Sequence, residues 1–249
     1  MKIGFLLCAY NQEEFISDCL KELVEFSSTN GHVISAVSVP FKEYENMGIE
    51  EDSTIPILQR ELEDGAIDHL FTSPKHISEA EARNLALKPL LEEECDVICL
   101  IDADEMMTYK DLKNIFNYVE YSEFIDWWAI SYKNYVGNGY LEEAFTPPRI
   151  FKTKIRKGKL KEFYFDNDVI YDTKFGDVNY KTLSNKVIPK EIAWPDHYSW
   201  TNTEKNKQKI EYQNAHFGLC SYKWEDGVVF NDEFYQKTGQ VKPKIVYEN

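Results

Sequence analysis

The sequence predicts an α/β fold in which helices cover a largely parallel sheet. Apolar runs of strand length alternate with segments of helical periodicity through the first 105 residues. The run at residues 97–101 is continuously apolar, rich in β-branched residues, and ends abruptly in three carboxylates within four residues. Strands buried on both faces of a parallel sheet have such continuous runs, and a β-α-β-α order favours parallel strands joined by right-handed crossovers. A chain of 249 residues can bury a sizeable core.

Apolar runs in the first half predict four strands, and the segments between them predict three helices. The strands are expected at residues 3–9, 33–39, 67–72 and 96–101. The helices are expected at residues 11–24, 54–64 and 78–94. Asn11, followed three residues later by Glu14, is expected to cap the first helix. Ser78 and Glu81 form the same capping-box pattern at the start of the third helix.

The second half is richer in aromatic residues and predicts a mixed, more antiparallel sheet. Strand-like runs lie at residues 125–135, 149–152, 160–165, 169–171 and 187–194. Helices are expected at 112–119 and from about 204 to 217. Because no linker, repeat or low-complexity tract interrupts the chain, we expect one domain over 1–249. Its parts are a first half (1–105), a second half (106–200) and a C-terminal helix and tail (201–249).

The composition excludes two classes of partner. A formal net charge of −15 would repel nucleic acid and anionic lipid, and a phosphate-bearing ligand would need a metal or local cations. The five cysteines are odd in number and lie mostly in apolar runs, which indicates reduced core residues of a cytosolic protein. With no signal peptide and no apolar run near ~20 residues, we expect a cytoplasmic protein without a transmembrane segment.

Asp102 and Asp104 follow the most apolar strand and are the first candidates for a site. In open α/β sheets, ligands bind beyond the carboxyl ends of the strands. Two carboxylates one residue apart repel each other, and Mg²⁺ or Mn²⁺ relieves this repulsion while also binding substrate phosphates. The alternative is a solvated acidic turn without a ligand.

Five motifs then occur in order along the chain. They are A-Y-N-Q-E at 9–13, E-A-R-N at 81–84, D-A-D-E at 102–105, P-R-I-F-K at 148–152 and H-Y-S-W at 197–200. Over roughly residues 1–200, this set resembles a family 2 glycosyltransferase of the GT-A fold. The resemblance implies a nucleotide-binding parallel β/α half fused to a mixed-sheet acceptor half.

The resemblance also implies ligands and residue roles. The donor would be a nucleotide-sugar, with a UDP-sugar favoured, and the cofactor a divalent metal, Mn²⁺ or Mg²⁺. The residues that would contact or support the donor are Ala9, Tyr10, Asn11, Arg83, Asp102 and Ala103. Asp104 would bind the metal directly, Asp102 would contact the ribose or reach the metal, and His197 would supply a further ligand.

The implied reaction moves a sugar to a hydroxyl of a saccharide or other acceptor, with inversion. The metal would stabilise the diphosphate leaving group, and a carboxylate would take the proton of the acceptor hydroxyl. Asp168 is the candidate for this general base, and Glu162 and Asp172 compete with it.

The sequence departs from the family in two places. S-V-P-F-K stands at 38–42 in place of the usual acidic D-D-G-S run, which leaves the choice of nucleotide open. The late Glu-Asp motif that often carries the base is missing. A catalytically degenerate glycosyltransferase-like domain that binds a sugar or a protein is therefore the alternative function.

Other interpretations also remain. A phosphatase of the haloacid dehalogenase type uses D-x-D at a strand end, but Met106 stands where that class has Thr or Val. Tyr10 could simply close the core, Arg83 could pair with Glu79 on its own helix, and His197 could be structural.

Overall fold

The chain forms two compact units in a computed structural model. The structure describes residues 1–42, 45, 51–142, 146–153, 163–166, 173–175, 178–201 and 204–247. Unit 1 comprises Met1–Ser131 and Thr146–Trp194, and unit 2 comprises Tyr132–Phe145 and Pro195–Asn249. These boundaries differ from the expected halves at 105 and 200, because a segment of unit 2 is inserted between two strands of unit 1.

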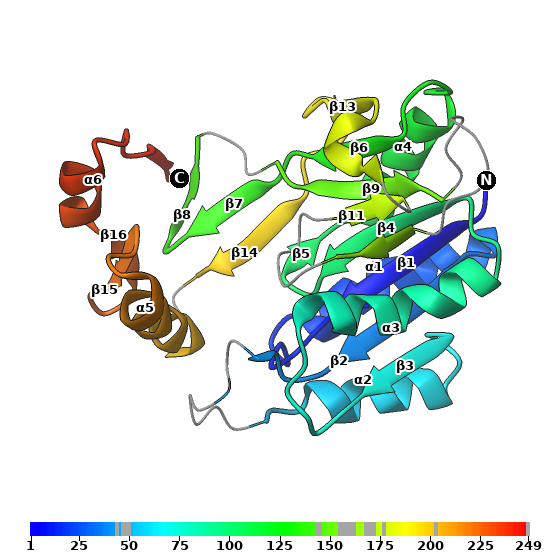
Figure 1. Cartoon of the computed structure of the whole chain (residues 1–249), viewed down its shortest axis with the longest axis horizontal. Helices are drawn as coiled ribbons and strands as arrows, with labels where there is room; N and C mark the ends of the chain where they lie inside the picture. The colour runs from blue at the N-terminus through cyan, green and yellow to red at the C-terminus, as the bar shows by residue number, and fades with distance from the viewer. Residues whose placement is uncertain are drawn as a thin grey trace. The chain divides into compact units, whose positions relative to one another are not determined.

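Unit 1 is organised around a seven-stranded sheet with the order β13-β6-β9-β4-β1-β2-β3 (Figure 1). Its strands are β1 (Ile3–Cys8), β2 (Val33–Ser38), β3 (His69–Thr72), β4 (Val97–Asp102), β6 (Trp127–Ile130), β9 (Pro148–Lys152) and β13 (Asn185–Ile188). Strands β4, β1, β2 and β3 are mutually parallel, as the alternating pattern predicts. Strand β9 runs antiparallel to both β4 and β6 and joins the two halves of the sheet.

Four helices accompany this sheet: α1 (Ile16–Asn30), α2 (Thr54–Glu63), α3 (Glu79–Glu92) and α4 (Tyr109–Glu120). The predicted capping box at Ser78 is confirmed, since its side chain accepts from the Glu81 N–H. The predicted cap at Asn11 is wrong. Asn11 has a left-handed backbone (φ 54°), and α1 begins only at Ile16, after a turn closed by hydrogen bonds to the Gln12 carbonyl.

Short elements complete unit 1. They are β5 (Glu105–Met106), β10 (Phe163–Phe165), β11 (Thr173–Phe175), β12 (Val178–Asn179) and a 3-10 turn at Tyr180–Thr182. Strands β10, β11 and β12 form a small antiparallel sheet, which agrees with the antiparallel expectation for the second half. The expected strand at 169–171 lies outside the described residues.

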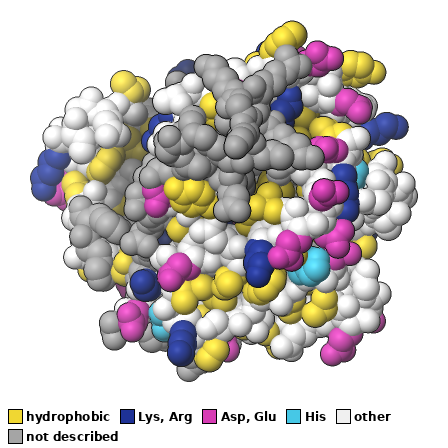
Figure 2. All heavy atoms as spheres, turned by 45° about the vertical axis from the view of Figure 1, so that its right-hand side comes forward, with side chains coloured by type: hydrophobic (Ala, Val, Ile, Leu, Met, Phe, Trp, Pro, Cys, Tyr) yellow, Lys and Arg dark blue, Asp and Glu magenta, His cyan; other side chains and the backbone are white. Residues whose placement is uncertain are grey.

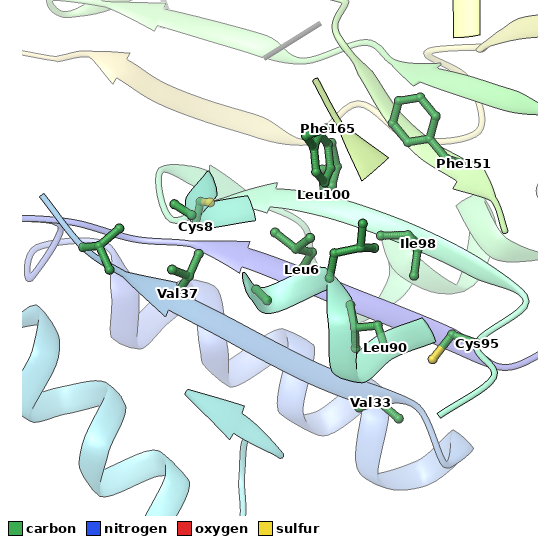
Figure 3. Close-up of a cluster of buried hydrophobic side chains, with 14 of the residues drawn as sticks. Leu6, Cys8, Val33, Val37, Leu90, Cys95, Ile98, Leu100, Phe151 and Phe165 are labelled. Atoms are coloured by element: carbon green, nitrogen blue, oxygen red, sulfur yellow. The ribbon is translucent and has the colours of Figure 1, made fainter. Parts of the chain in front are cut away.

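One core cluster of unit 1 lies between the central strands and α3. Leu6, Ile98 and Leu100 point from the sheet into a cluster that also takes Leu90 of α3 and Phe151 of β9 (Figure 3). The apolar run at 97–101 is fully buried, as the sequence predicts. All five cysteines are buried thiols, in agreement with their expected place in the core. This packing fixes the strand ends that carry the candidate site.

Unit 2 contains a sheet with β17, β8, β7 and β14 side by side, a hairpin and two helices. The elements are β7 (Lys133–Val136), β8 (Gly139–Leu141), β14 (Asp196–Trp200), α5 (Glu204–Phe217), β15 (Tyr222–Trp224), β16 (Val228–Phe230), α6 (Asp232–Thr238) and β17 (Ile245–Val246). Val136, Leu141, Ile210, Val228 and Phe230 form its core. The expected C-terminal tail contains a short strand, β17, which adds an edge strand to β8.

The surface is consistent with the acidic composition. Figure 2 shows Asp and Glu side chains spread over one face, with Lys and Arg side chains between them. Among the described residues, no helix combines the length and the apolar character that a membrane span requires.

Candidate functional site

The carboxyl ends of β1 and β4 bring two of the predicted motifs to one edge of the sheet. Cys8 and Asp102 are direct partners in the parallel register, and the Ala103 N–H donates to the Cys8 carbonyl at 3.3 Å. The chain leaves β1 into residues 9–13 and leaves β4 into residues 103–105 from the same edge. This is the edge at which α/β sheets bind ligands.

Asp102 lies between two buried arginines. Arg83 Nη2 donates to Asp102 Oδ1 at 3.1 Å, and Arg149 Nη2 donates to Asp102 Oδ2 at 2.7 Å. The two arginine side chains are 1% and 3% exposed, whereas the Asp102 side chain is 28% exposed. Each oxygen of this carboxylate therefore has its own guanidinium.

Each of these arginines also donates hydrogen bonds to a second carboxylate. Glu79 Oε1 accepts from Nε and Nη2 of Arg83 at 3.0 and 2.7 Å. Glu105 Oε1 accepts from Nε of Arg149 at 3.0 Å and also from its Nη2, and Glu105 Oε2 accepts from the Asp102 N–H at 3.2 Å. We call Glu79, Arg83, Asp102, Arg149 and Glu105 the ion network.

Local structure explains why the ion network assembles here. The capping box at Ser78 starts α3, and the four-residue spacing of Glu79 and Arg83 places both side chains on one helix face. Arg149 comes from β9, which pairs antiparallel with β4 and so brings this side chain beside the end of β4. Glu105 follows in β5, immediately after the turn that begins at Asp102.

Burial dominates the electrostatics of the ion network. The Glu105 side chain has no exposed surface, and this burial raises its pKa to about 7 although Arg149 opposes the shift. Burial also raises the pKa of Glu79, again against the pull of Arg83. The negative charges of the three carboxylates and the positive charges of the two guanidinium groups nearly cancel, and buried charges need such pairing. These interactions hold the Asp102 side chain in one position at the carboxyl-end edge of the sheet.

Asp104 is the carboxylate that fits a divalent metal. It lies in the turn between β4 and β5 and is partly exposed. Mg²⁺ is commonly held by one or two carboxylates together with substrate phosphates and water, so Asp104 suits a site completed by a ligand. Among the described residues, no three His, Cys, Asp or Glu side chains are already arranged to hold a metal ion. A metal bound directly to Asp102 would have to compete with Arg83 and Arg149.

A second set of contacts holds Tyr10 and Asn11. Asn11 Oδ1 accepts from the Asp52 N–H at 3.2 Å, and Thr54 Oγ1 accepts from the Gln12 N–H at 2.7 Å. Asp52 Oδ2 accepts from the Glu13 N–H at 3.1 Å. Tyr10 stays partly exposed, and its pKa is raised by burial and by the nearby Glu51 and Asp52. The segment after β1 is therefore fixed by the start of α2.

The other predicted site residues are distributed over unit 1, unit 2 and the part of the chain outside the described residues. Ala9 and Ala103 lie at the carboxyl-end edge of the sheet, but both are buried. His197 belongs to β14 of unit 2, where it is buried and its ring lies 5.8 Å from the ring of Tyr132. Asp168 and its competitors Glu162 and Asp172 lie outside the described residues.

The roles of Arg149 and Glu105 were not predicted from the sequence. Arg149 stands within the quoted motif P-R-I-F-K, where its side chain is buried between apolar neighbours. An arginine in a buried strand is almost always paired with an acid. That rule signals the need for a partner, but the linear sequence does not identify Glu105 as that partner.

Comparisons with known proteins support the fold. No family model and no curated protein sequence matches the chain. By structure it is similar to the crystal structure of S. aureus TarS residues 1–349, with a TM-score of 0.52, 16% identity, and coverage of 86% of this chain and 64% of that one. The same TarS fragment in complex with UDP gives a TM-score of 0.51 at 16% identity, with the same coverages.

A longer TarS structure gives a TM-score of 0.53 at 16% identity, and the match covers 86% of this chain and 39% of that one. The chain thus spans less than two thirds of the length of these structures. The predicted α/β fold class of GT-A type is confirmed by the sheet and by this similarity.

Proposed function

We propose that this protein is a metal-dependent glycosyltransferase that moves a sugar from a nucleotide-sugar donor to an acceptor hydroxyl. The observation that carries the proposal is the ion network, which fixes Asp102 at the ligand-binding edge of a GT-A-type sheet, two residues before a partly exposed Asp104. Such costly buried charges are expected at functional sites rather than at random surface turns. The similarity to a UDP-bound structure supports a UDP-sugar as the donor.

The donor would lie along the edge formed by the ends of β1 and β4. Tyr10 would stack on the base, because it is partly exposed and its backbone is fixed between β1 and the contacts of Asn11. Asp102 would accept hydrogen bonds from the ribose hydroxyls, because its side chain is 28% exposed at this edge. The adjacent backbone at Ala9 and Ala103 would form the floor beneath the nucleotide.

Asp104 would hold the Mn²⁺ or Mg²⁺, with diphosphate oxygens and water as further ligands and His197 as a further predicted one. When bound, the metal supplies Lewis-acid stabilisation of the charge that develops on the diphosphate leaving group. Arg83 and Arg149 would keep the Asp102 carboxylate oriented while the donor binds. Pre-organised groups of this kind do not have to reorient during the reaction.

The acceptor would be a saccharide or another hydroxyl compound. Inversion at the sugar carbon requires a carboxylate that takes the acceptor proton. Asp168 remains the predicted base, with Glu162 and Asp172 as competitors.

Thermal unfolding with a panel of nucleotide-sugars tests this function. UDP-, GDP-, CMP- and dTDP-sugars would each be added with and without Mn²⁺. A ligand at about 100 times its Kd adds about 2.7 kcal/mol, which raises the Tm of a chain of this size by several degrees. We expect such a shift for one nucleotide class, and for that class only with metal. No shift with any nucleotide would contradict the proposal and favour the degenerate binding domain.

A further inference from the structure

A row of three tyrosines crosses one face of the unit 2 sheet. Tyr140 of β8 lies directly opposite Tyr135 of β7 in the antiparallel register, and their rings meet edge to face with centroids 6.1 Å apart. Tyr198 of β14 stacks on Tyr135, with centroids 4.9 Å apart and ring planes only 11° apart. All three side chains are partly exposed. Aromatic rings therefore extend across three adjacent strands.

Lys133 and Asp196 lie beside this row. They are direct partners in the parallel register of β7 and β14. The Lys133 ammonium lies 4.3 Å from the ring centroid of Tyr140 and 5.2 Å from that of Tyr135. The Tyr198 hydroxyl donates to Asp196 Oδ2 at 3.2 Å. We call Lys133, Tyr135, Tyr140, Asp196 and Tyr198 the tyrosine platform.

The tyrosine platform is distinct from the core of unit 2. Strand alternation sends Asn134 and Val136 to the opposite, buried face, and His197 follows them on β14. Val136 is part of the apolar core, whereas none of the platform residues belongs to that core. Half-exposed aromatic rings that the core does not require are candidates for binding.

The chemistry of the tyrosine platform restricts its ligand. Its lysine and aspartate balance each other, so it lacks the several cations that nucleic acid or an anionic membrane requires. Lys133 already lies over two of the rings and would repel a cationic ligand. Burial, and then Asp196, raises the pKa of Tyr198 to about 12, so this phenol stays a neutral hydrogen-bonding group.

We propose that the tyrosine platform binds a saccharide. The C–H face of a sugar ring would stack on the side of the Tyr198 ring that Tyr135 does not cover, and sugar hydroxyls would hydrogen-bond to the Asp196 carboxylate and the phenols. Apolar ring faces combined with a few fixed polar groups are the usual composition of a specific small-molecule site. The proposal rests on the proposed function only in naming this saccharide as the acceptor.

The test uses the full chain and an array of neutral and acidic oligosaccharides. We expect the parent to bind a subset of them, and Tyr135→Ala and Tyr198→Ala to lose at least ~10-fold in affinity. Asp196→Asn keeps the shape of the side chain and is expected to weaken binding by a similar factor without unfolding the sheet. The matched control is Tyr121→Ala, whose side chain is 87% exposed in unit 1 and which should bind as the parent does.

Tyr198→Phe separates stacking from hydrogen bonding, because it keeps the ring and should retain more affinity than Tyr198→Ala. A parent that binds no oligosaccharide would overturn the proposal. So would platform variants that bind as well as the parent.

Nucleotide-induced thermal shifts of the same proteins separate this proposal from the proposed function. Platform variants should keep the nucleotide shift of the parent while losing saccharide affinity. If the parent shows no nucleotide-induced thermal shift while its saccharide binding depends on the tyrosine platform, that result would contradict the proposed glycosyltransferase function and support the saccharide site. If the parent shows the nucleotide-induced shift and all variants bind saccharide equally well, the proposed saccharide site is contradicted and the proposed glycosyltransferase function is supported.

Discussion

Arg149 and Glu105 are 44 residues apart in the sequence, and their side chains meet inside unit 1 with Nε 3.0 Å from Oε1. Neither side chain has appreciable exposed surface. The same guanidinium also holds Asp102, so a single arginine connects a fully buried carboxylate to one at the edge of the candidate site. This relationship links the stability of unit 1 to the geometry of its ligand-binding edge.

Replacing Arg149 by methionine should destabilise the protein strongly. Removing one partner of a buried ion pair leaves a charge without compensation and costs about 3–5 kcal/mol. We expect the free energy of unfolding, measured in urea, to fall by about 3 kcal/mol. The control is Arg60→Met, because Arg60 pairs with Glu61 at the surface and such pairs contribute less than about 1 kcal/mol. Equal effects in the two variants would show that the ion network does not stabilise the fold.

Glu105 should make stability depend on pH. Its pKa of about 7 in the folded state exceeds the ordinary value of a glutamate, so the folded protein holds a proton that the unfolded chain has lost. The stabilisation is complete below about pH 4.5 and is lost as the pH rises through 7. One pKa unit corresponds to about 1.4 kcal/mol, so we expect a loss of about 2 kcal/mol between pH 5 and pH 8.

Urea unfolding at several pH values measures this effect. Glu105→Gln cannot lose the proton and should be less sensitive to pH over this window. Glu92→Gln, at an exposed position of α3, should follow the parent. An identical pH dependence in all three proteins would mean that Glu105 does not titrate in this range.

Asp104→Asn should abolish the metal-dependent part of nucleotide binding while leaving the stability of the ligand-free protein within about 0.5 kcal/mol, because the side chain is partly exposed. Asp102→Asn should instead lower stability by about 2 kcal/mol, because Arg83 and Arg149 lose the charge between them. Thermal unfolding with UDP, with and without Mn²⁺, gives both quantities. If Mn²⁺ increases the UDP-induced thermal shift of Asp104→Asn as much as that of the parent, the assignment of Asp104 to the metal site is wrong.

His197→Ala should weaken Mn²⁺ binding in the presence of UDP by about 10-fold or more, as losses around metal sites commonly do. Calorimetric titration measures the affinity. His197→Gln preserves more volume at this buried position, and His69→Ala in β3 serves as the control. Parental Mn²⁺ affinity in both His197 variants would make His197 a structural residue that packs against Tyr132.

Local signals predicted much of unit 1 correctly. The four parallel strands follow from apolar runs, and the start of α3 follows from Ser78 and Glu81. The ion pair between Glu79 and Arg83 also follows from their spacing on one helix. The failure at Asn11 has a specific cause. Asn11 uses its side chain to hold Asp52, which is distant in the sequence, and so does not cap the following helix.

The fold class, the buried strand that ends at Asp102 and the motifs that follow β1 and β4 could all be predicted from the linear sequence. Periodicity and capping are short-range properties, so they can be inferred from neighbouring residues. The antiparallel position of β9 between β4 and β6 is known only from the three-dimensional structure, and it is this position that brings Arg149 to Asp102 and Glu105. The stacking of Tyr198 on Tyr135 across β14 and β7 is likewise visible only in the folded chain. Strand order and register depend on contacts between segments that are distant in the sequence. Buried charges and aromatic rings are stabilised only when the complete fold brings their partners to them.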